Sequence, residues 1–231
     1  MSKRPLNAGS LGKVRTNTMS MAESKDQLYE EIVNFFGVLK SLVEEKEFYE
    51  KRLDQEPNSF EKLAYTRAYF SYFEAINFRL KYLAFRASQL LHIDLSRADI
   101  SILLEEKYDI TNKGVVKSYE KYFPVINNMR FIDNIYAKHF NLKSRIDFKS
   151  QSWNEFTKSL QIRNRITHVK DPFDFEINKT ELEVIQSSFD WYLNYIFRIA
   201  SESLKWIMYN IEGEEGNELI DSLIIRVINF A

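Results

Sequence analysis

Glycine and proline are scarce in this chain, and their scarcity sets the strongest limit on its fold. Only 6 of the 231 residues are glycine and 4 are proline, so long helices can run without interruption. Apolar residues make up 45% of the chain and recur at spacings of three and four, which is the period of an amphipathic helix. No strand alternation of useful length is visible. The sequence therefore predicts an all-α protein with a sizeable core.

Two long helices are expected in the first half of the chain. The apolar spacing predicts one over residues 26–53, ending before Pro57, which cannot continue a helix. The second is expected over residues 59–92, because Asn58 and Glu61 form a capping-box pattern at its start. Aromatic residues occupy more than one face of this second helix, which is typical of a helix in the centre of a bundle.

Shorter elements are expected in the middle of the chain. A third helix is predicted to begin after Ser96 and to end near Tyr108. Residues 111–114 predict a turn, and a helical stretch is expected over residues 117–122. Another helix follows over residues 125–140, where apolar residues again mark one face.

The next helix is expected to begin at Ser152, which forms a capping-box pattern with Glu155. It is expected to stop by Val169, because Pro172 forces the residue before it toward an extended conformation. A short loop then leads to the last long helix.

The last long helix is predicted to begin after Thr180, with Glu183 completing its cap. An acidic turn follows, and a short amphipathic helix is expected from Leu219 onward. Its apolar face fits packing on its own bundle or on a partner. Together these elements predict an antiparallel helical bundle of about five main helices with extra short helices.

Three regions follow from this division of the chain. Residues 1–24 are polar and basic, and we expect a disordered tail or an artificial or alternative-start extension there. A transit peptide is the alternative, because the arginines and lysines fit although no amphipathic helix is visible. Residues 25–212 are expected to form the helical domain, and residues 213–231 a short C-terminal amphipathic helix.

Composition excludes several classes of function. The chain has no cysteine, which rules out disulfides, zinc–thiolate sites, iron–sulfur clusters and thiol nucleophiles. The formal net charge of −1 excludes a globally basic coat for nucleic acid but not a local basic patch. No run of about 18 apolar residues occurs, so we expect no membrane span. A cytoplasmic protein is the simplest interpretation.

The three histidines differ in their surroundings. His92 and His139 lie near expected helix ends, where packing or capping is the ordinary role of a histidine. His168 instead lies among cations and an amide, just before a proline that stops the helix. Its neighbours in the sequence are Arg163, Asn164, Arg165 and Lys170.

Residues 163–168 have the sequence RNRITH. This segment resembles the Arg-x4–6-His motif of the HEPN superfamily (higher eukaryotes and prokaryotes nucleotide-binding domains), in which the second position is often asparagine, as at Asn164. The family fold is a helical bundle with the motif near the end of one helix and a further helix after it. Residues 26–212 are expected to follow that order. Many HEPN proteins are metal-independent endoribonucleases, often toxins or antiviral effectors, and others are inactive partners.

The resemblance implies that RNA is cleaved by attack of the ribose 2′-hydroxyl on the neighbouring phosphate. Such a reaction needs a proton acceptor, a proton donor and a cation for the developing charge. His168 can serve as acid or base near neutral pH, and Arg163 can bind phosphate oxygens. Asn164 is expected to orient the imidazole or the substrate. No metal and no cofactor is required, and the sequence offers no convincing carboxylate–histidine cluster.

A basic segment surrounds the motif. Residues 138–170 carry eight lysines and arginines against two acidic residues. Arg165, Lys158 and Lys170 are therefore candidates for RNA binding, which should weaken steeply with salt. The alternative is a solvated basic face with no ligand.

The spacing of the motif bears on assembly. Residues five apart on an ideal helix differ by about 140° around the axis, so Arg163 and His168 do not share a narrow face, whereas Asn164 and His168 do. Either the helix unwinds before His168 or the site assembles from two chains. A single reactive histidine per chain favours two chains, and we expect a homodimer with both motifs facing a shared cleft. An antitoxin or other regulatory protein would be a further partner.

Two more residues are expected to support the site, Glu74 and Thr167. Glu74 stands in an aromatic segment, where burying an unpaired carboxylate is costly, so we expect it to pair with Arg163 or another motif cation. Arg67 and Arg79 are alternative partners, and an exposed Glu74 is the simpler possibility. Two other interpretations of the whole chain remain open at this point. One is a non-catalytic HEPN-like module that binds nucleotides or proteins, and the other is an unrelated helical scaffold.

Overall fold

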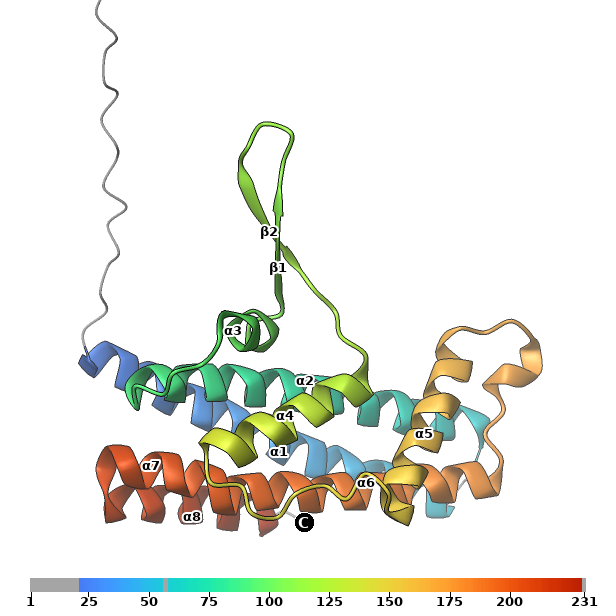
Figure 1. The fold of residues 1–231 in the computed structure, drawn as a ribbon. Coiled ribbons are helices and arrows are strands. Elements are labelled where there is room, and N and C mark those ends of the chain that lie inside the picture. Colours follow the sequence, from blue (N-terminus) through green and yellow to red (C-terminus); the bar gives the residue numbers. More distant parts are fainter. Residues whose placement is uncertain (1–20, 56–57, 230–231) are drawn as a thin grey trace, which may run out of the picture.

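The computed structural model describes residues 21–55 and 58–229. Most of these residues lie in helices, and one β-hairpin is inserted among them (Figure 1). In chain order the elements are α1 (Met21–Gln55), α2 (Ser59–Leu90), α3 (Arg97–Leu103), β1 (Glu106–Ile110), β2 (Val116–Glu120), α4 (Val125–His139), α5 (Gln151–Thr167), the 3-10 helix η1 (Pro172–Phe175), α6 (Lys179–Arg198), the π-helical turn η2 (Ile199–Leu204), α7 (Lys205–Glu212) and α8 (Glu214–Ile228).

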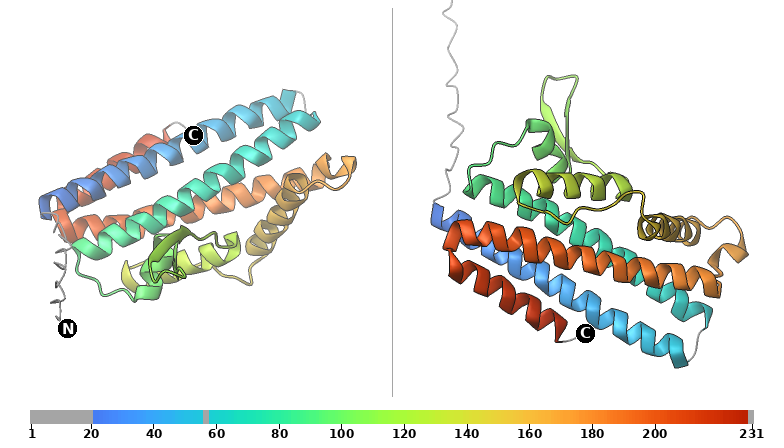
Figure 2. Two further views of the ribbon diagram at one scale, coloured as in Figure 1. Left: turned by 90° about the horizontal axis from the view of Figure 1, so that it is seen from above. Right: turned by 60° about the horizontal axis from the view of Figure 1, so that its bottom comes forward.

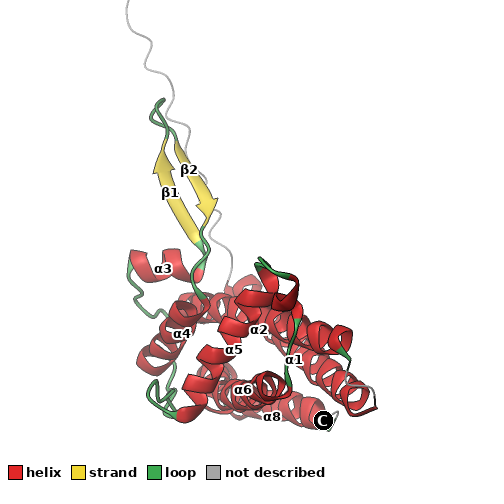
Figure 3. Ribbon diagram, turned by 90° about the vertical axis from the view of Figure 1, so that its right-hand side faces the viewer, coloured by secondary structure: helices red, strands yellow, loops and turns green. Residues whose placement is uncertain are grey.

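The long helices pack antiparallel, which confirms the predicted bundle for the described residues. Helices α1 and α2 run side by side, and α6 continues through η2 into α7 along the same direction of the molecule (Figure 1). Helix α8 folds back along α7 and against α1 (Figure 2). Helices α4 and α5 cover the face of the bundle that α2 and α6 form (Figure 3).

Aromatic rings hold α2 at the centre of this arrangement, as its sequence predicts. The centroid of the Phe73 ring lies 4.4 Å from that of Tyr192 on α6 and 5.3 Å from that of Phe156 on α5. Tyr69 lies one turn earlier on α2, 4.5 Å from the ring of Phe189. All of these side chains are buried, and each buried aromatic contributes roughly 1.5–3 kcal/mol. This packing fixes α5 beside α2 and thereby positions the end of α5, where the Arg-x4-His segment lies.

The hairpin corrects two predictions. The third helix does not reach Tyr108, and residues 117–122 are not helical, because strands β1 and β2 occupy these positions with Ile110 opposite Val116. The predicted turn over residues 111–114 is confirmed as the tip of the hairpin, where Gly114 has a φ of +72°. The hairpin stands away from the bundle (Figure 3), so no core stabilises a helix there, and a short helix without such packing is marginal in water.

The start of α2 follows the predicted cap only in part. The side chain of Asn58 accepts a hydrogen bond from the backbone N–H of Glu61 at 2.9 Å, as expected. The Glu61 carboxylate does not return to Asn58 but accepts from the guanidinium of Arg52 at the end of α1. A charged donor is a stronger partner than a backbone amide, which explains why the box is half formed.

The caps of α5 and α6 lie two residues earlier than predicted. Ser150, not Ser152, caps α5 by accepting from the third backbone N–H of the helix. Asn178 and Glu181 form a reciprocal capping box on α6, so Thr180 is already inside the helix. Both segments contain overlapping cap patterns two residues apart, and the sequence alone does not decide between them.

The C-terminal helix packs on its own bundle. Only Gly213, with a φ of +67°, turns the chain, and α8 begins at once at Glu214, so the predicted acidic turn before Leu219 is wrong. An added Cβ at Gly216 would lie 2.4 Å from the backbone oxygen of Met208, so this glycine allows α8 to approach α7 closely. Buried residues of α8 then join the core against α1 and α7.

The N-terminal helix begins at Met21, inside the segment 1–24 that was expected to be a tail. The rest of that predicted tail, residues 1–20, lies outside the described residues, as does the predicted helix stop at Pro57. Of the helices that the structure describes, none has the length and apolarity that crossing a bilayer requires.

Candidate functional site

The end of α5 confirms the predicted helix stop before Val169. His168 is the C-terminal cap residue, with φ of −113° and ψ of 58°, and its backbone N–H donates to the Asn164 carbonyl at 3.0 Å. The Thr167 hydroxyl donates to the Arg163 carbonyl at 2.7 Å, within the last turn. The imidazole of His168 is exposed, so it is free of the apolar packing that would prevent proton transfer.

A pocket of about 650 Å³ opens between this helix end and α2. Arg163, Thr167 and His168 line it from α5, and Glu74 lines it from the middle of α2. Both ends of the Arg-x4-His segment therefore meet the same cavity within one chain. The remaining lining residues are Arg67, Phe70, Ser71, Ile166, Val169 and Phe175.

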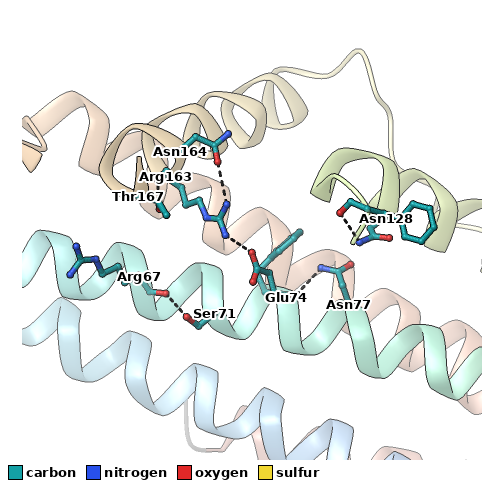
Figure 4. Close-up of polar contacts among 10 residues, drawn as sticks. Arg67, Ser71, Glu74, Asn77, Asn128, Arg163, Asn164 and Thr167 are labelled. Atoms are coloured by element: carbon teal, nitrogen blue, oxygen red, sulfur yellow. Dashed lines mark hydrogen bonds and ion pairs between the residues drawn. The ribbon is translucent and has the colours of Figure 1, made fainter. Parts of the chain in front are cut away.

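Arg163 and Glu74 form an ion pair across the pocket, which is the pairing expected for this carboxylate. Arg163 Nη2 donates to Glu74 Oε1 at 2.5 Å, and Arg163 Nη1 donates to Asn164 Oδ1 at 3.2 Å (Figure 4). The Glu74 side chain is 45% exposed and that of Arg163 is 28% exposed. Glu74 is thus a surface carboxylate, and the concern about burying it does not apply.

The structure reverses the expected relation among the motif residues. Arg163 and His168 line the same pocket, whereas Asn164 lines a neighbouring one of about 580 Å³ on the other side of the Arg163 side chain. Helical spacing holds only while the helix continues, and the φ of −113° at His168 turns its side chain from the direction that a helical residue would give it. Of the two explanations for the spacing, the end of the helix at His168 therefore suffices to bring both groups into one pocket.

None of the three residues predicted to bind RNA lines the pocket of His168. Arg165 donates to the Glu176 carbonyl at 2.9 Å and to Glu181 Oε1 at 2.7 Å, so it fastens α5 to the start of α6. It lines a third pocket together with Lys158, on a different side of α5 from His168. Lys170 is exposed in the loop after His168 but does not line the pocket of His168.

The folded arrangement weakens the basic character of residues 138–170. Counting charges along this segment gives a large excess of cations, but carboxylates from other parts of the chain come close to its arginines. The ion pairs are Arg145 with the fully buried Asp133 at 2.7 Å, Arg163 with Glu74 at 2.5 Å and Arg165 with Glu181 at 2.7 Å.

Sequence reasoning overlooked two residues of the pocket, Arg67 and Ser71, although it considered Arg67 as a partner of Glu74. Both lie on α2, with Ser71 four residues after Arg67 and three residues before Glu74. The Ser71 hydroxyl donates to the Arg67 carbonyl at 2.9 Å. Arg67, Ser71 and Glu74 form a polar stripe at helical spacing on an otherwise aromatic helix (Figure 4). That stripe was the available signal.

The other two histidines lie away from the pocket. His92 follows α2 with a φ of 52° and is exposed. His139 ends α4, where burial together with the nearby Lys138 lowers its pKa. Among the described residues there is no group of three or more His, Asp and Glu side chains that could hold a metal ion.

No match emerges when the chain is compared with protein-family models, with curated proteins and with solved structures. What the protein does must therefore be inferred from the residues that line its pockets.

The pocket combines groups that suit chemistry on a phosphate. An exposed imidazole can accept or donate a proton, and two guanidinium groups can bind an anion. Arg163 has five N–H donors, and its two bonds to Glu74 and Asn164 leave other N–H groups for a ligand. The arrangement is able to transfer protons and to stabilise negative charge in one place.

Proposed function

We propose that the protein is a metal-independent endoribonuclease of the HEPN type. One observation carries the proposal: Arg163 and His168, the two ends of the Arg-x4-His segment, line a single pocket of about 650 Å³. The ion pair of Arg163 with Glu74 supports it further, because it holds the guanidinium at the side of that pocket.

In the proposed reaction, a base removes the proton from a ribose 2′-hydroxyl and the oxygen attacks the adjacent phosphorus. The bond from phosphorus to the 5′-oxygen breaks, and an acid protonates that oxygen. The products are a 2′,3′-cyclic phosphate and a 5′-hydroxyl. His168 supplies one of these proton transfers, and Arg163 stabilises the charge that builds on the phosphate oxygens.

Arg67 and Glu74 have supporting roles in this scheme. Arg67 adds a second cation to the pocket and attracts the backbone of the RNA. Glu74 is a positioning residue, because it touches Arg163 and fixes its direction rather than acting on the RNA. A phosphate bound here would meet the guanidinium groups of both Arg163 and Arg67.

We further propose that two chains act together, since each pocket holds only one histidine among its described lining residues. Pockets that face each other would supply one imidazole as base and one as acid. Refolding wild type with an equal amount of His168→Asn tests this idea in a homodimer. About a quarter of the dimers are then wild type and about half are mixed. If each site needs both chains, mixed dimers are inactive and the mixture keeps about a quarter of the activity of the same total amount of wild type. If each chain acts alone, it keeps about half.

The test of the ribonuclease proposal compares two histidines that follow helices and are both exposed, His168 and His92. We expect RNA cleavage in the presence of EDTA for the wild type and for His92→Asn, because asparagine tolerates a positive φ. His168→Asn should lose at least about a hundredfold in rate, which is typical for a missing general acid or base. Full cleavage by His168→Asn would refute the proposal.

A non-catalytic binding module is the second candidate, and the Arg163–Glu74 ion pair favours it, since a paired guanidinium also suits a structural role. Such a module would bind RNA or nucleotides and never yield products.

If the enzyme acts as a toxin or antiviral effector on cytoplasmic RNA, expressing the wild type should slow growth and His168→Asn should not. Co-purification of an inhibitory protein would then identify the regulator.

A further inference from the structure

A second pocket adjoins the proposed cleavage site. It measures about 340 Å³ and lies at the base of the hairpin, between α2, the strands and α4. Glu74 lines both this pocket and the pocket of His168, so the two cavities share a wall. Cavities of this size suit a small organic group. A nucleotide chain bound at His168 could therefore place one of its bases here.

Aromatic side chains form one part of the lining. Tyr122 is 86% exposed and Phe78 is 44% exposed, and Phe123 lies between the hairpin and α4 beside them. Large aromatic rings that are left open at a cavity are natural stacking partners for a flat base. Tyr122 contributes little to the core of this chain, and its ring is open to a ligand in the pocket.

Asn77 supplies a directed polar atom. Its side chain is buried, with 5% exposed, and its Nδ2 donates to the Phe73 carbonyl at 2.8 Å and to the Tyr192 hydroxyl at 3.3 Å. Figure 4 shows this amide nitrogen turned toward its partner, with the oxygen on the opposite side. No described residue donates a hydrogen bond to that oxygen. Asn77 lines the pocket, so this acceptor is available to an N–H group of a ligand.

Carboxylates, which only accept hydrogen bonds when ionised, form most of the other polar lining of the pocket. The Asn128 oxygen accepts from Lys81, and one N–H of its amide donates to the Phe123 carbonyl at 3.4 Å. Lys81 is buried and pairs with Glu105, which leaves the second oxygen of that carboxylate for a ligand. Glu120 adds a further carboxylate at the end of β2. An occupant must therefore bring hydrogen-bond donors.

We infer that this second pocket, lined by Asn77, Glu105, Glu120 and Tyr122, binds a nucleobase of the RNA, with guanine as the preferred base. Guanine carries a ring N–H beside an amino group, and these two donors match the two oxygens of a carboxylate. Uracil has a single ring N–H and no amino group, so it satisfies fewer acceptors. The role in cleavage rests on the proposed ribonuclease function, but binding of the base does not.

Binding of free nucleotides to the full chain tests the inference without any need for cleavage. Equilibrium dialysis should show GMP binding at least about tenfold more tightly than UMP, which is the discrimination expected from one good pair of hydrogen bonds. Equal binding of GMP and UMP, or binding of a lysine-rich peptide in place of either nucleotide, would overturn it.

Two tyrosines of the hairpin region provide a matched pair of variants. Tyr122→Ala removes a ring that lines the pocket, whereas Tyr119→Ala removes one that is 48% exposed on β2 and outside the lining. Both are surface changes that should leave folding intact. Tyr122→Ala should weaken GMP binding about tenfold or more, as loss of a stacking ring does, and Tyr119→Ala should not. Equal effects of the two changes would contradict the assignment.

The outcomes for the pocket and for the enzyme are separable. The His168→Asn variant should bind GMP as the wild type does. Selective GMP binding without any RNA cleavage would support the base pocket and refute the ribonuclease. Cleavage without preference for guanine at a fixed position, together with unselective nucleotide binding, would support the ribonuclease and refute the base pocket.

Discussion

Replacing Glu74 by glutamine separates positioning of Arg163 from stability of the fold. The ion pair is 2.5 Å long, but its side chains are 45% and 28% exposed, and exposed pairs contribute only about 0.2–1 kcal/mol. The free energy of unfolding should therefore fall by less than about 1 kcal/mol. The guanidinium, however, loses its charged anchor, and a displacement of about 1 Å can cost about a hundredfold in rate. We expect kcat/KM for RNA to fall by about 10- to 100-fold.

The same helix offers a matched control for this change. Glu31 on α1 accepts from Arg79 on α2 at 2.7 Å, with side chains 16% and 32% exposed, and neither residue lines the pocket of His168. Glu31→Gln should lower stability at least as much as Glu74→Gln and leave cleavage unchanged. Urea denaturation and cleavage of a fluorogenic RNA in EDTA measure the two effects. Wild-type cleavage by Glu74→Gln, or an equal loss in Glu31→Gln, would refute the positioning role.

Other predictions concern the scaffold. Asp133→Ala should lower the free energy of unfolding by about 1–3 kcal/mol, since it leaves a buried backbone N–H without its acceptor, while the half-exposed Arg145 can turn to water. A loss under about 0.5 kcal/mol in urea would contradict this. Gly216→Ala should cost about 1–3 kcal/mol through its clash with α7, whereas Gly37→Ala, in open space on α1, should gain about 0.5–1 kcal/mol. A melting temperature of Gly216→Ala that equals or exceeds that of Gly37→Ala would contradict the close packing of α8 on α7. Burial acts to raise the pKa of Glu202, but hydrogen bonds from Ser144 and Lys143 outweigh it and lower the pKa below 4.5. The stability due to Glu202 is therefore present above pH 4.5 and lost as the pH falls toward the lowered pKa. On acidification below pH 4.5, the free energy of unfolding should fall more for the wild type than for Glu202→Gln. Parallel plots of unfolding free energy against pH for the two proteins would contradict this.

The long helices were predictable because the apolar residues that mark their faces in the sequence are the residues that the folded bundle buries. The apolar face of residues 26–53 and the aromatic faces of residues 59–92 are the surfaces that the bundle buries. Caps were harder to place, because Ser150 and Ser152 offer the same chemistry two residues apart. The hairpin was missed since each strand is only five residues long and largely exposed, so neither alternation nor burial marks it clearly.

The candidate site was predictable in part for a similar reason. Arg163 and His168 are close in sequence, so a local motif identified both. Glu74, the ion partner of Arg163, is 89 residues away from it, and only its polar character among aromatics pointed to it. The pairing of Arg165 could not be read from local charge, because its partner Glu181 lies on the next long helix. Spacing along an ideal helix misled the analysis of Asn164, since the helix ends at His168.

The chemical ends of digested RNA test the central claim most directly. RNA incubated with the wild type in EDTA should yield fragments with 2′,3′-cyclic phosphates and 5′-hydroxyls, and His168→Asn, prepared in the same way, should yield none. Fragments with 5′-phosphates, or cyclic phosphates produced equally by His168→Asn, would contradict a reaction in which His168 and Arg163 act on the phosphate of RNA.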